Sequence, residues 1–331
     1  MKILITGAAG FIGFHLSKKL LEAGFHVIGV DNLNPYYDVK LKEARLENLY
    51  LINKKKNSKF NFYKVNLESY KDLKLIFEKY KPNCVINLAA QAGVRYSLEN
   101  PFAYIESNIV GFQNIIQLSK DFEVKNFIFA SSSSVYGGNI NMPFKETDKV
   151  GHPVSIYAAT KRSNELVAHT YSNLYGLSVT GLRFFTVYGP WGRPDMALFL
   201  FTKAILNNEP IKVFNNGEMM RDFTYIDDVV ESIFKLIIKP ACNNPEFDKT
   251  NPDLSRSWAP FRIFNIGNSS PTPLMEYIKA IESSLKIKAK IEYLPMQKGD
   301  VKMTFADTSA LESWINYKPS TNIKDGVDEF I

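Results

Sequence analysis

The sequence predicts a doubly wound α/β fold, in which helices cover both faces of a parallel β-sheet. The chain opens with a short apolar run, Lys2–Thr6, that is followed at once by the closely spaced glycines Gly7, Gly10 and Gly13. Strand-like and helix-like segments then alternate through the first half of the chain. The segments with chemically useful side chains fall after predicted strands, which is where ligands bind to sheets of this kind.

The alternation is regular enough to give each element in order. Runs of apolar and β-branched residues predict buried strands, and apolar residues at helical spacing predict the helices between them. The predicted strands are residues 2–6, 26–30, 60–65, 83–88, 126–130 and 178–184. The predicted helices are residues 11–23, 40–56, 70–80, 101–121 and 156–175. Right-handed βαβ crossovers join such strands into one parallel sheet.

After about residue 185 the pattern changes to helices mixed with short strands. Residues 197–207, 227–239 and 273–285 predict helices, and residues 211–214 and 262–266 predict strands. Residues 243–260 are polar and contain prolines, which indicates a long surface loop. We therefore expect a dinucleotide-binding domain over residues 1–185. Residues 186–331 should form mainly a smaller α/β substrate-binding lobe, with some chain returning to the first domain.

Composition favours a soluble globular protein, since 45% of the 331 residues are hydrophobic and 22% are charged. The net charge of +6 leaves acidic ligands open, but the lysines are scattered apart from a run at Lys54, Lys55 and Lys56. That run indicates a solvated helix end, so no nucleic-acid partner is expected. No apolar stretch reaches the roughly 18 residues that span a membrane, and the N-terminus lacks a signal pattern.

The cysteine and histidine content excludes two further classes of protein. Two cysteines, Cys84 and Cys242, are too few for a disulfide framework, so the default location is the cytoplasm. The four histidines show no metal-ligand spacing, so no metal site is expected.

The glycine turn predicts a dinucleotide. Gly7 allows a tight turn, Gly10 lets the backbone approach a pyrophosphate, and Gly13 lets helix and strand pack closely. The pyrophosphate would then lie at the positive end of the helix dipole. Asp31 ends the second predicted strand, where a carboxylate accepts hydrogen bonds from the adenosine ribose and repels a 2′-phosphate. The pattern favours NAD over NADP.

A second motif, Tyr157 with Lys161, predicts proton transfer next to that cofactor. A free phenol has a pKa of about 10, so a tyrosine base needs help at neutral pH. Four residues apart on a helix, the two side chains share a face, and the lysine charge would lower the phenol pKa together with an oxidised nicotinamide. The lysine can also hold the nicotinamide ribose. One hydroxyl of the serine run 131–134 can share the substrate proton.

These motifs together resemble the extended short-chain dehydrogenase/reductase family, and within it the nucleotide-sugar epimerases. The resemblance covers essentially the whole chain, and residues 186–197 resemble the UDP-glucuronate 4-epimerases, those of capsular polysaccharide biosynthesis in particular. The segments that carry it are 7–13, 31–32, 88–91, Asn108, 131–137, 157–161, 183–189, 221–228 and 299–300.

The resemblance implies a Rossmann fold and NAD-dependent C4 epimerisation of UDP-glucuronate to UDP-galacturonate. Tyr157 takes the proton of the sugar 4-hydroxyl while the C4 hydride passes to NAD. The transient 4-keto sugar rotates about its pyrophosphate linkage and receives the hydride on its opposite face. Ser132 aligns with the catalytic hydroxyl of the family, and its neighbours Ser133 and Ser134 stay open. Because the cofactor returns oxidised, it should be held tightly.

The resemblance also implies the NAD contacts. Asn66 stands where many relatives carry an acidic residue for the adenine, and Asn can still donate and accept there. The expected NAD-binding residues are Gly7, Gly10, Phe11, Ile12, Gly13, Asp31, Asn32, Asn66, Leu67, Leu88, Ala89, Ala90, Gln91, Asn108, Tyr157, Lys161 and Tyr188.

Glucuronate poses a chemical problem that suggests a role for Arg193. Oxidation at C4 gives a β-keto acid, which loses CO₂ when its carboxylate bond lines up with the carbonyl π system. An arginine fork gripping the carboxylate could hold that bond out of alignment, and Thr186 could add a hydrogen bond. Arg221 is expected at the diphosphate. The remaining expected substrate contacts are Ser132, Ser133, Arg95, Val213, Phe214, Gln297 and Asp300.

Three alternatives stay open. A UDP-N-acetylglucosamine or N-acetylglucosaminuronate 4-epimerase would share everything except the Arg193 argument. UDP-glucuronate decarboxylase passes through the same ketone. A cofactor-sensing or RNA-binding Rossmann protein is disfavoured because the tyrosine–lysine pair is present. A dehydratase is unlike this chain, since no acidic residue stands beside Ser132. The family also implies a homodimer formed by the helices around Asn108 and Tyr157.

Overall fold

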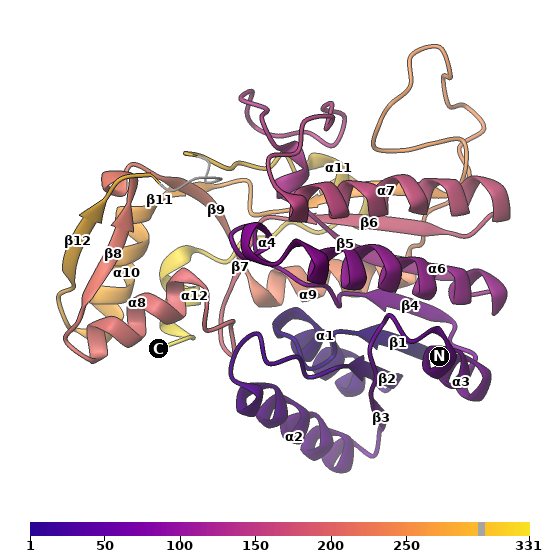
Figure 1. Cartoon of the computed structure of the whole chain (residues 1–331), viewed down its shortest axis with the longest axis horizontal. Helices are drawn as coiled ribbons and strands as arrows, with labels where there is room; N and C mark the ends of the chain where they lie inside the picture. The colour runs from indigo at the N-terminus through magenta and orange to yellow at the C-terminus, as the bar shows by residue number, and fades with distance from the viewer. Residues whose placement is uncertain (297–301) are drawn as a thin grey trace. The chain divides into compact units, whose positions relative to one another are not determined.

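The structure, a computed structural model, describes residues 1–296 and 302–331 (Figure 1). The chain divides into two compact units. The first unit comprises residues 1–140, 146–184 and 233–264, and the second comprises residues 141–145, 185–232 and 265–331. Gln297 and Asp300, two of the expected substrate contacts, lie outside the described residues.

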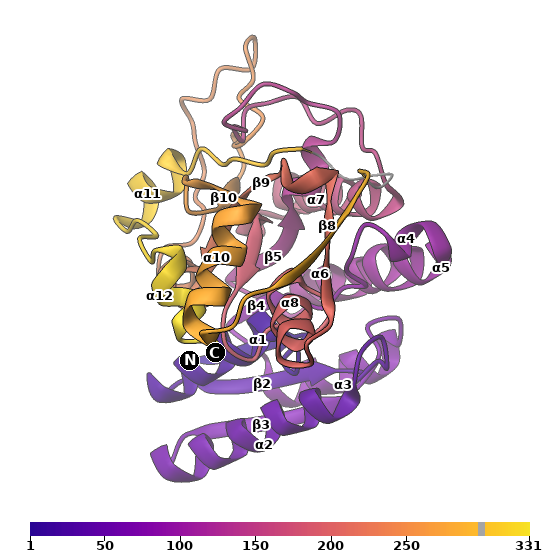
Figure 2. The ribbon, with the colours of Figure 1, turned by 90° about the vertical axis from the view of Figure 1, so that its left-hand side faces the viewer.

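A seven-stranded sheet forms the centre of the first unit, in the order β10-β6-β5-β4-β1-β2-β3. Strands β1 to β6 pair in parallel, so the predicted doubly wound parallel sheet is confirmed. Figure 2 shows the outer strands β2 and β3 with α2 beside them. The strands are β1 (Lys2–Thr6), β2 (His26–Asp31), β3 (Lys59–Lys64), β4 (Cys84–Asn87), β5 (Asn126–Ser132), β6 (Val179–Phe184) and β10 (Phe261–Ile266).

Helices pack on the sheet as two groups of neighbours. Helix α1 lies next to α2, while α6 lies between α3 and α7, and Figure 1 shows α6 and α7 side by side. The core between sheet and helices is apolar, with Leu4, Val85 and Phe127 fully buried. The elements are α1 (Phe11–Glu22), α2 (Val39–Lys56), α3 (Tyr70–Tyr80), α4 (Tyr96–Glu99), α5 (Pro101–Tyr104), a π-helix (Ile105–Val110), α6 (Gly111–Asp121), a 3₁₀ turn (Ser133–Tyr136) and α7 (Ile156–Tyr175).

The helix predicted over residues 101–121 is wrong in one respect, because a π-helical turn at Ile105–Val110 interrupts it. Within this turn, Asn164 of α7 donates its side-chain amide to the Asn108 carbonyl at 2.7 Å. The Asn108 side chain is itself buried and bonded to Gln91 and Thr160. Such π turns occur often at functional sites.

The second unit holds two small sheets. One has the order β11-β9-β7, and the other pairs β8 with β12 in parallel. Helix α9 (Ile226–Ile238) begins in this unit and ends in the first. The strands are β7 (Thr186–Tyr188), β8 (Pro210–Phe214), β9 (Met220–Tyr225), β11 (Pro271–Pro273) and β12 (Lys290–Leu294). The other elements are α8 (Ala197–Leu206), a 3₁₀ turn (Asn215–Gly217), α10 (Leu274–Leu285), α11 (Ser309–Ile315) and α12 (Ile323–Asp328).

Four of these strands, β7, β9, β11 and β12, were not predicted from the sequence. Strands β7 and β11 have three residues each and exist as strands because they flank β9. In β9 the polar residues Asp222 and Thr224 are fully buried, which hides the alternation that marks a strand. Within the described part of the chain, no helix is both long and apolar enough to cross a membrane.

Candidate active site

The glycine turn between β1 and α1 is shaped by close backbone contacts. Gly7 has a φ of +74°, and its carbonyl packs so tightly on the helix that a Cβ at Gly13 would lie 2.0 Å from the Gly7 oxygen. Gly10 is the N-cap residue of α1, and no side chain caps the helix there. The amide groups of its first turn therefore face the position that a pyrophosphate takes in such folds. The turn fits a bound dinucleotide.

Asp31 ties this turn to the loop after β2. Its buried carboxylate accepts the Ala9 amide at 3.2 Å and the Leu33 amide at 2.8 Å. Sequence reasoning missed Arg45, a fully buried residue of α2 that donates to the Ala9 carbonyl at 2.9 Å and to the Tyr37 hydroxyl at 2.8 Å. The only sequence signal was that α2 lacks a continuous apolar stripe, so its buried face includes charged residues.

The segment after β4 lies directly against the glycine turn. A Cβ at Gly7 would come within 2.8 Å of the Ala89 amide nitrogen, and that amide donates to Thr6 at 3.2 Å. Asn108 holds the end of the segment, since it bonds both backbone groups of Gln91 at 2.8 and 3.0 Å. The order β4-β1-β2 thus brings together most of the expected NAD contacts, residues 7–13, 31–32, 88–91 and Asn108. Leu67 is buried and Asn66 exposed just beyond β3.

Tyr157 and Lys161 lie together on α7, which begins where the Ser155 hydroxyl caps the Ala158 amide. The Lys161 ammonium lies 6.0 Å from the centre of the Tyr157 ring and donates to the Ala130 carbonyl at 2.8 Å. Burial lowers the pKa of Lys161 to about 8, because an ammonium loses its hydration inside the protein. Tyr157 is half-buried.

The serine run at the end of β5 has distinct members. The Ser131 hydroxyl is buried and donates to Glu165 at 2.6 Å. Ser132 accepts the Ser134 amide at 3.2 Å and donates to the Ser134 hydroxyl at 3.1 Å. Ser133 is half-buried in the 3₁₀ turn. The contact with Glu165 leaves Ser132, Ser133 and Ser134 as the hydroxyls that a substrate can use.

Glu165 is a further residue that sequence reasoning missed. It follows Lys161 by one helical turn and accepts from Arg183 at 2.9 and 3.0 Å and from Arg162 at 2.8 Å. Burial by itself raises the pKa of Glu165, but the charge and hydrogen bonds of Arg183 outweigh it and hold the pKa below its usual range. The spacing Tyr157, Lys161, Glu165 was the available signal, because residues four apart share a helical face.

In the second unit Arg193 forms a two-bond fork with a carboxylate of its own chain. Its Nε and Nη2 donate to the two oxygens of Asp195 at 2.9 and 2.5 Å. Both residues lie in the loop between β7 and α8. The arginine thus already has the orientation that a carboxylate ligand requires. Sequence reasoning named Arg193 and missed Asp195.

Three more of the expected substrate contacts that the structure describes in the second unit lie on β8 and β9, and Thr186 lies on β7. Arg221 of β9 donates to the carbonyls of Met220 and Lys302 at 2.9 and 3.1 Å. On β8, Val213 is buried and Phe214 half-buried, while Thr186 is half-buried on β7. 

Two expected residues have surroundings that limit what their side chains can contact. Tyr188, expected at NAD, has its ring packed on Phe223, Tyr225 and Tyr277 and its hydroxyl on the Asn322 carbonyl, and burial raises its pKa. Its side chain belongs to the core of the second unit. Arg95, in the first unit, is exposed just before α4.

A half-buried tyrosine beside a buried lysine, at the edge of a dinucleotide-binding sheet, is the catalytic pair of a nicotinamide-dependent enzyme. Residues 3–248 match the NAD dependent epimerase/dehydratase family. The chain belongs to that family.

Three relatives extend the comparison over the whole chain. It is 57% identical to protein CapI of Staphylococcus aureus, covering 100% of this chain and 97% of CapI. It is 47% identical to the probable UDP-glucuronate 4-epimerase of Rhizobium meliloti, covering 100% and 96%. Among solved structures it is similar to UDP-glucuronic acid 4-epimerase of Bacillus cereus in complex with UDP-glucuronic acid and NAD, with 32% identity, a TM-score of 0.85 and coverage of 99% and 97%.

Proposed function

We propose that this chain is an NAD-dependent UDP-glucuronate 4-epimerase, which interconverts UDP-glucuronate and UDP-galacturonate. The observation that carries the reaction type is the contact between Tyr157 and Lys161 at the carboxyl ends of the strands that form the NAD site. The relatives of Rhizobium meliloti and Bacillus cereus support the substrate, since the chain matches both over nearly their whole length.

The residues of the first unit carry the proton chemistry in this proposal. NAD, when bound, supplies the acceptor and donor of the hydride at the sugar C4. Tyr157 takes the proton of the 4-hydroxyl and returns it after the 4-keto sugar has rotated to present its opposite face. The ammonium of Lys161 stabilises the phenolate, because an opposite charge nearby favours the ionised form. Ser132 donates a hydrogen bond to the reacting oxygen, and Ser133 and Ser134 are the alternative donors.

Arg193 selects the substrate and protects it. Its guanidinium binds the C6 carboxylate as it binds Asp195 in the structure. The bond between C5 and the carboxylate is then held out of alignment with the π system of the C4 ketone, which prevents loss of CO₂. Thr186 adds a hydrogen bond to the carboxylate. Arg221 binds the diphosphate, and the β8 residues Val213 and Phe214 bind the uracil. Arg95, Gln297 and Asp300 are further proposed substrate contacts.

The test is incubation of the purified protein with UDP-glucuronate, without added NAD, followed by anion-exchange chromatography. We expect a UDP-galacturonate peak, formed with NAD that remains bound through purification. A UDP-pentose peak would assign a decarboxylase instead. No product, even with NAD supplied, would reject the substrate, and UDP-N-acetylglucosamine would then be the next sugar nucleotide to assay.

Arg193→Ala tests the carboxylate contact directly. We expect loss of UDP-glucuronate turnover by about a hundredfold or more, because a charge-assisted two-bond contact is removed, or a decarboxylated pentose product. Asp195→Ala is the matched control, since it removes a charged side chain from the same loop and leaves the Arg193 guanidinium in place. Unchanged kinetics without pentose in Arg193→Ala would contradict the proposed role.

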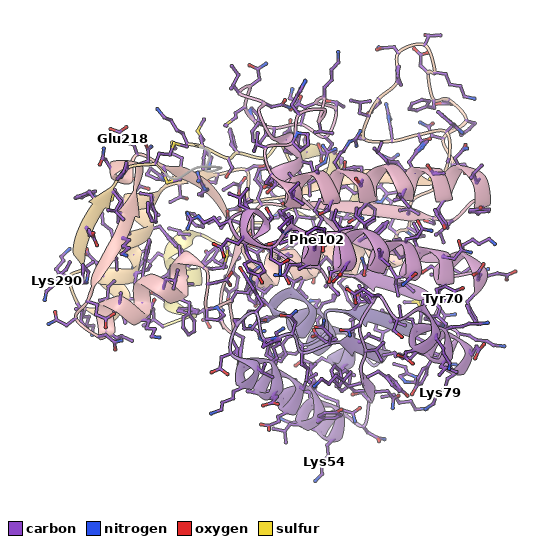
Figure 3. The ribbon with its side chains drawn as sticks, in the orientation of Figure 1. Lys54, Tyr70, Lys79, Phe102, Glu218 and Lys290 are labelled. Atoms are coloured by element: carbon purple, nitrogen blue, oxygen red, sulfur yellow. The ribbon has the colours of Figure 1, made fainter. Side chains whose placement is uncertain are left out.

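We further propose that the protein is a cytoplasmic homodimer. Helices α4, α5 and α7 and the π-helix expose apolar side chains of the kind that dimer interfaces cover. Phe102 of α5, labelled in Figure 3, is 76% exposed. The others are Leu98, Ile105, Val110, Leu166 and Leu174. Free thiols at Cys84 and Cys242 support the reducing compartment.

A further inference from the structure

A contact between two loops bridges the glycine turn. Tyr36 lies in the loop after β2, and Tyr96 begins α4 after the loop that follows β4. Their ring centres are 5.1 Å apart. Because β1 lies between β2 and β4 in the sheet, a contact between the loops that follow these strands crosses the carboxyl end of β1. That end carries the glycine turn, where a dinucleotide binds.

The Tyr36 side of this contact is held in place by its own loop. Three consecutive turns fix the backbone, in which side chains of Asp31, Asn32 and Asn34 accept the amides two residues further on, at 2.7 to 2.9 Å. The last of these amides belongs to Tyr36 itself. Lys42 of α2 donates to the Asn34 carbonyl at 2.7 Å. The loop that begins at Asp31 is thus fixed by hydrogen bonds up to Tyr36.

The Tyr96 side is anchored to the catalytic helix. The ring of Tyr104, a fully buried residue, lies 6.3 Å from that of Tyr96 and 6.0 Å from that of Tyr157. Its hydroxyl donates to the Gly93 carbonyl at 2.6 Å. Gly93 has a φ of +106° and comes so close to Tyr36 that a Cβ there would lie 3.1 Å from the phenol oxygen. The bridge therefore joins two firmly held loops.

We propose that Tyr36 and Tyr96 form a clasp across the glycine turn that slows the release of NAD. The dinucleotide would extend from Asp31 at the adenosine ribose to Tyr157 at the nicotinamide, so it passes beneath the contact. NAD leaves only after the two rings separate. The inference rests on the proposed function, in which a cofactor that returns oxidised has no need to leave between turnovers.

Release of NAD from the loaded protein tests the clasp. The NAD-saturated protein is diluted into an excess of an NAD-hydrolysing enzyme, and the NAD left on the protein is measured over time. We expect Tyr36→Leu and Tyr96→Leu each to accelerate release about fivefold, as for the loss of one aromatic contact. Tyr293→Leu, which removes an exposed ring on β12, should keep the wild-type rate.

The double variant separates a clasp from two independent contacts with the cofactor. If the tyrosines act through each other, Tyr36→Leu with Tyr96→Leu releases NAD no faster than the faster single variant. A rate equal to the product of the two single effects would overturn the proposal, and so would single variants that release NAD at the wild-type rate.

A covalent link across the clasp should have the opposite effect on the rate of NAD release. Tyr36→Cys and Tyr96→Cys, in a Cys242→Ser background, supply two thiols that a flexible bismaleimide can join after NAD is loaded, while the buried Cys84 stays unreactive. We expect the linked protein to release NAD more slowly than wild type. Release at or above the wild-type rate would overturn the clasp, also where the leucine variants misfold.

These measurements need no sugar nucleotide. Wild-type conversion of UDP-glucuronate together with unchanged release in the variants rejects the clasp alone. Altered release in a protein that converts no UDP-glucuronate rejects the proposed substrate alone.

Discussion

Among single residues, Lys161 links burial most directly to function. Burial lowers its pKa from the ordinary 10.5 to about 8, so the amine is charged below that pH and neutral above it. A neutral amine cannot stabilise the Tyr157 phenolate. We therefore expect kcat/KM to fall as the pH rises through about 8, in a pH–rate profile of the epimerase reaction from pH 6 to 10.

Lys161→Arg is the control for this prediction. A guanidinium stays charged over the whole range. The variant should be slower, because its geometry differs, but its profile should lack the decline near pH 8. The same decline in both proteins would assign the titration to another group.

The serine run yields a second prediction at this scale. Ser131 donates to buried Glu165, so Ser131→Ala should lower the free energy of unfolding by about 1–2 kcal/mol and leave kcat nearly unchanged. Ser132→Ala should instead lower kcat by about a hundredfold with little change in stability. Steady-state kinetics and thermal denaturation of both variants check this. Loss of kcat in Ser131→Ala equal to that in Ser132→Ala would contradict the assignment.

The sequence predicted part of this site for a clear reason. The spacing of Tyr157 and Lys161 is local, since one helix presents both side chains. The role of Ser131 depends on how α7 packs on β5, and no local pattern contains that information. The same holds for Arg45, whose partner Ala9 is 36 positions away.

At the scale of elements, α7 is joined to the sheet by one buried ion pair. Glu165 of α7 and Arg183 of β6 are both fully buried, and Ser131 of β5 lies opposite Arg183 in the strand register. Glu165→Gln keeps the shape and removes the charge, which leaves the guanidinium without a counter-ion. We expect a loss of about 3–5 kcal/mol in the free energy of unfolding, measured by urea denaturation.

Glu78→Gln is the matched control. Glu78 pairs with Lys74 on α3 at 3.8 Å, and both side chains are about half exposed. Such a pair contributes about 0.5 kcal/mol or less. Equal losses in the two variants would show that burial of the Glu165 pair has no special effect.

Elements themselves were predictable where their cause is local. The apolar, β-branched runs of the central strands and the spacing of the helices that flank them were sufficient for the parallel sheet. The π turn at Ile105–Val110 was missed because the spacing of the residues predicts one continuous helix there, and that spacing does not show the bond from Asn164 of α7 to the Asn108 carbonyl. Strands β7 and β11 were missed because pairing with β9, and not their composition, makes them strands.

At the scale of the whole molecule, long-range pairing decides which segments belong to which unit. Residues 141–145 join the second unit, where the backbone of Phe144 bonds to Phe305 and Asp307 at 2.7 and 2.9 Å. Asn265 donates to the Phe144 carbonyl at 2.9 Å. These partners are more than 100 positions from Phe144, so no sequence pattern indicates that residues 141–145 join the second unit. The boundary expected at residue 185 stays a prediction.

The proposed dimer gives the last prediction. Phe102→Glu combined with Leu166→Glu places two carboxylates on the apolar helical face, 76% and 55% exposed in the single chain. An interface there would have to bury both charges without partners, which is strongly unfavourable. We expect wild type to sediment as a dimer and the variant as a monomer of 37.7 kDa, in analytical ultracentrifugation. Leu51→Glu introduces the same charge at a 65% exposed site on α2 and should leave the dimer intact. A monomeric wild type, or dissociation by Leu51→Glu as well, would show that this face is not the interface.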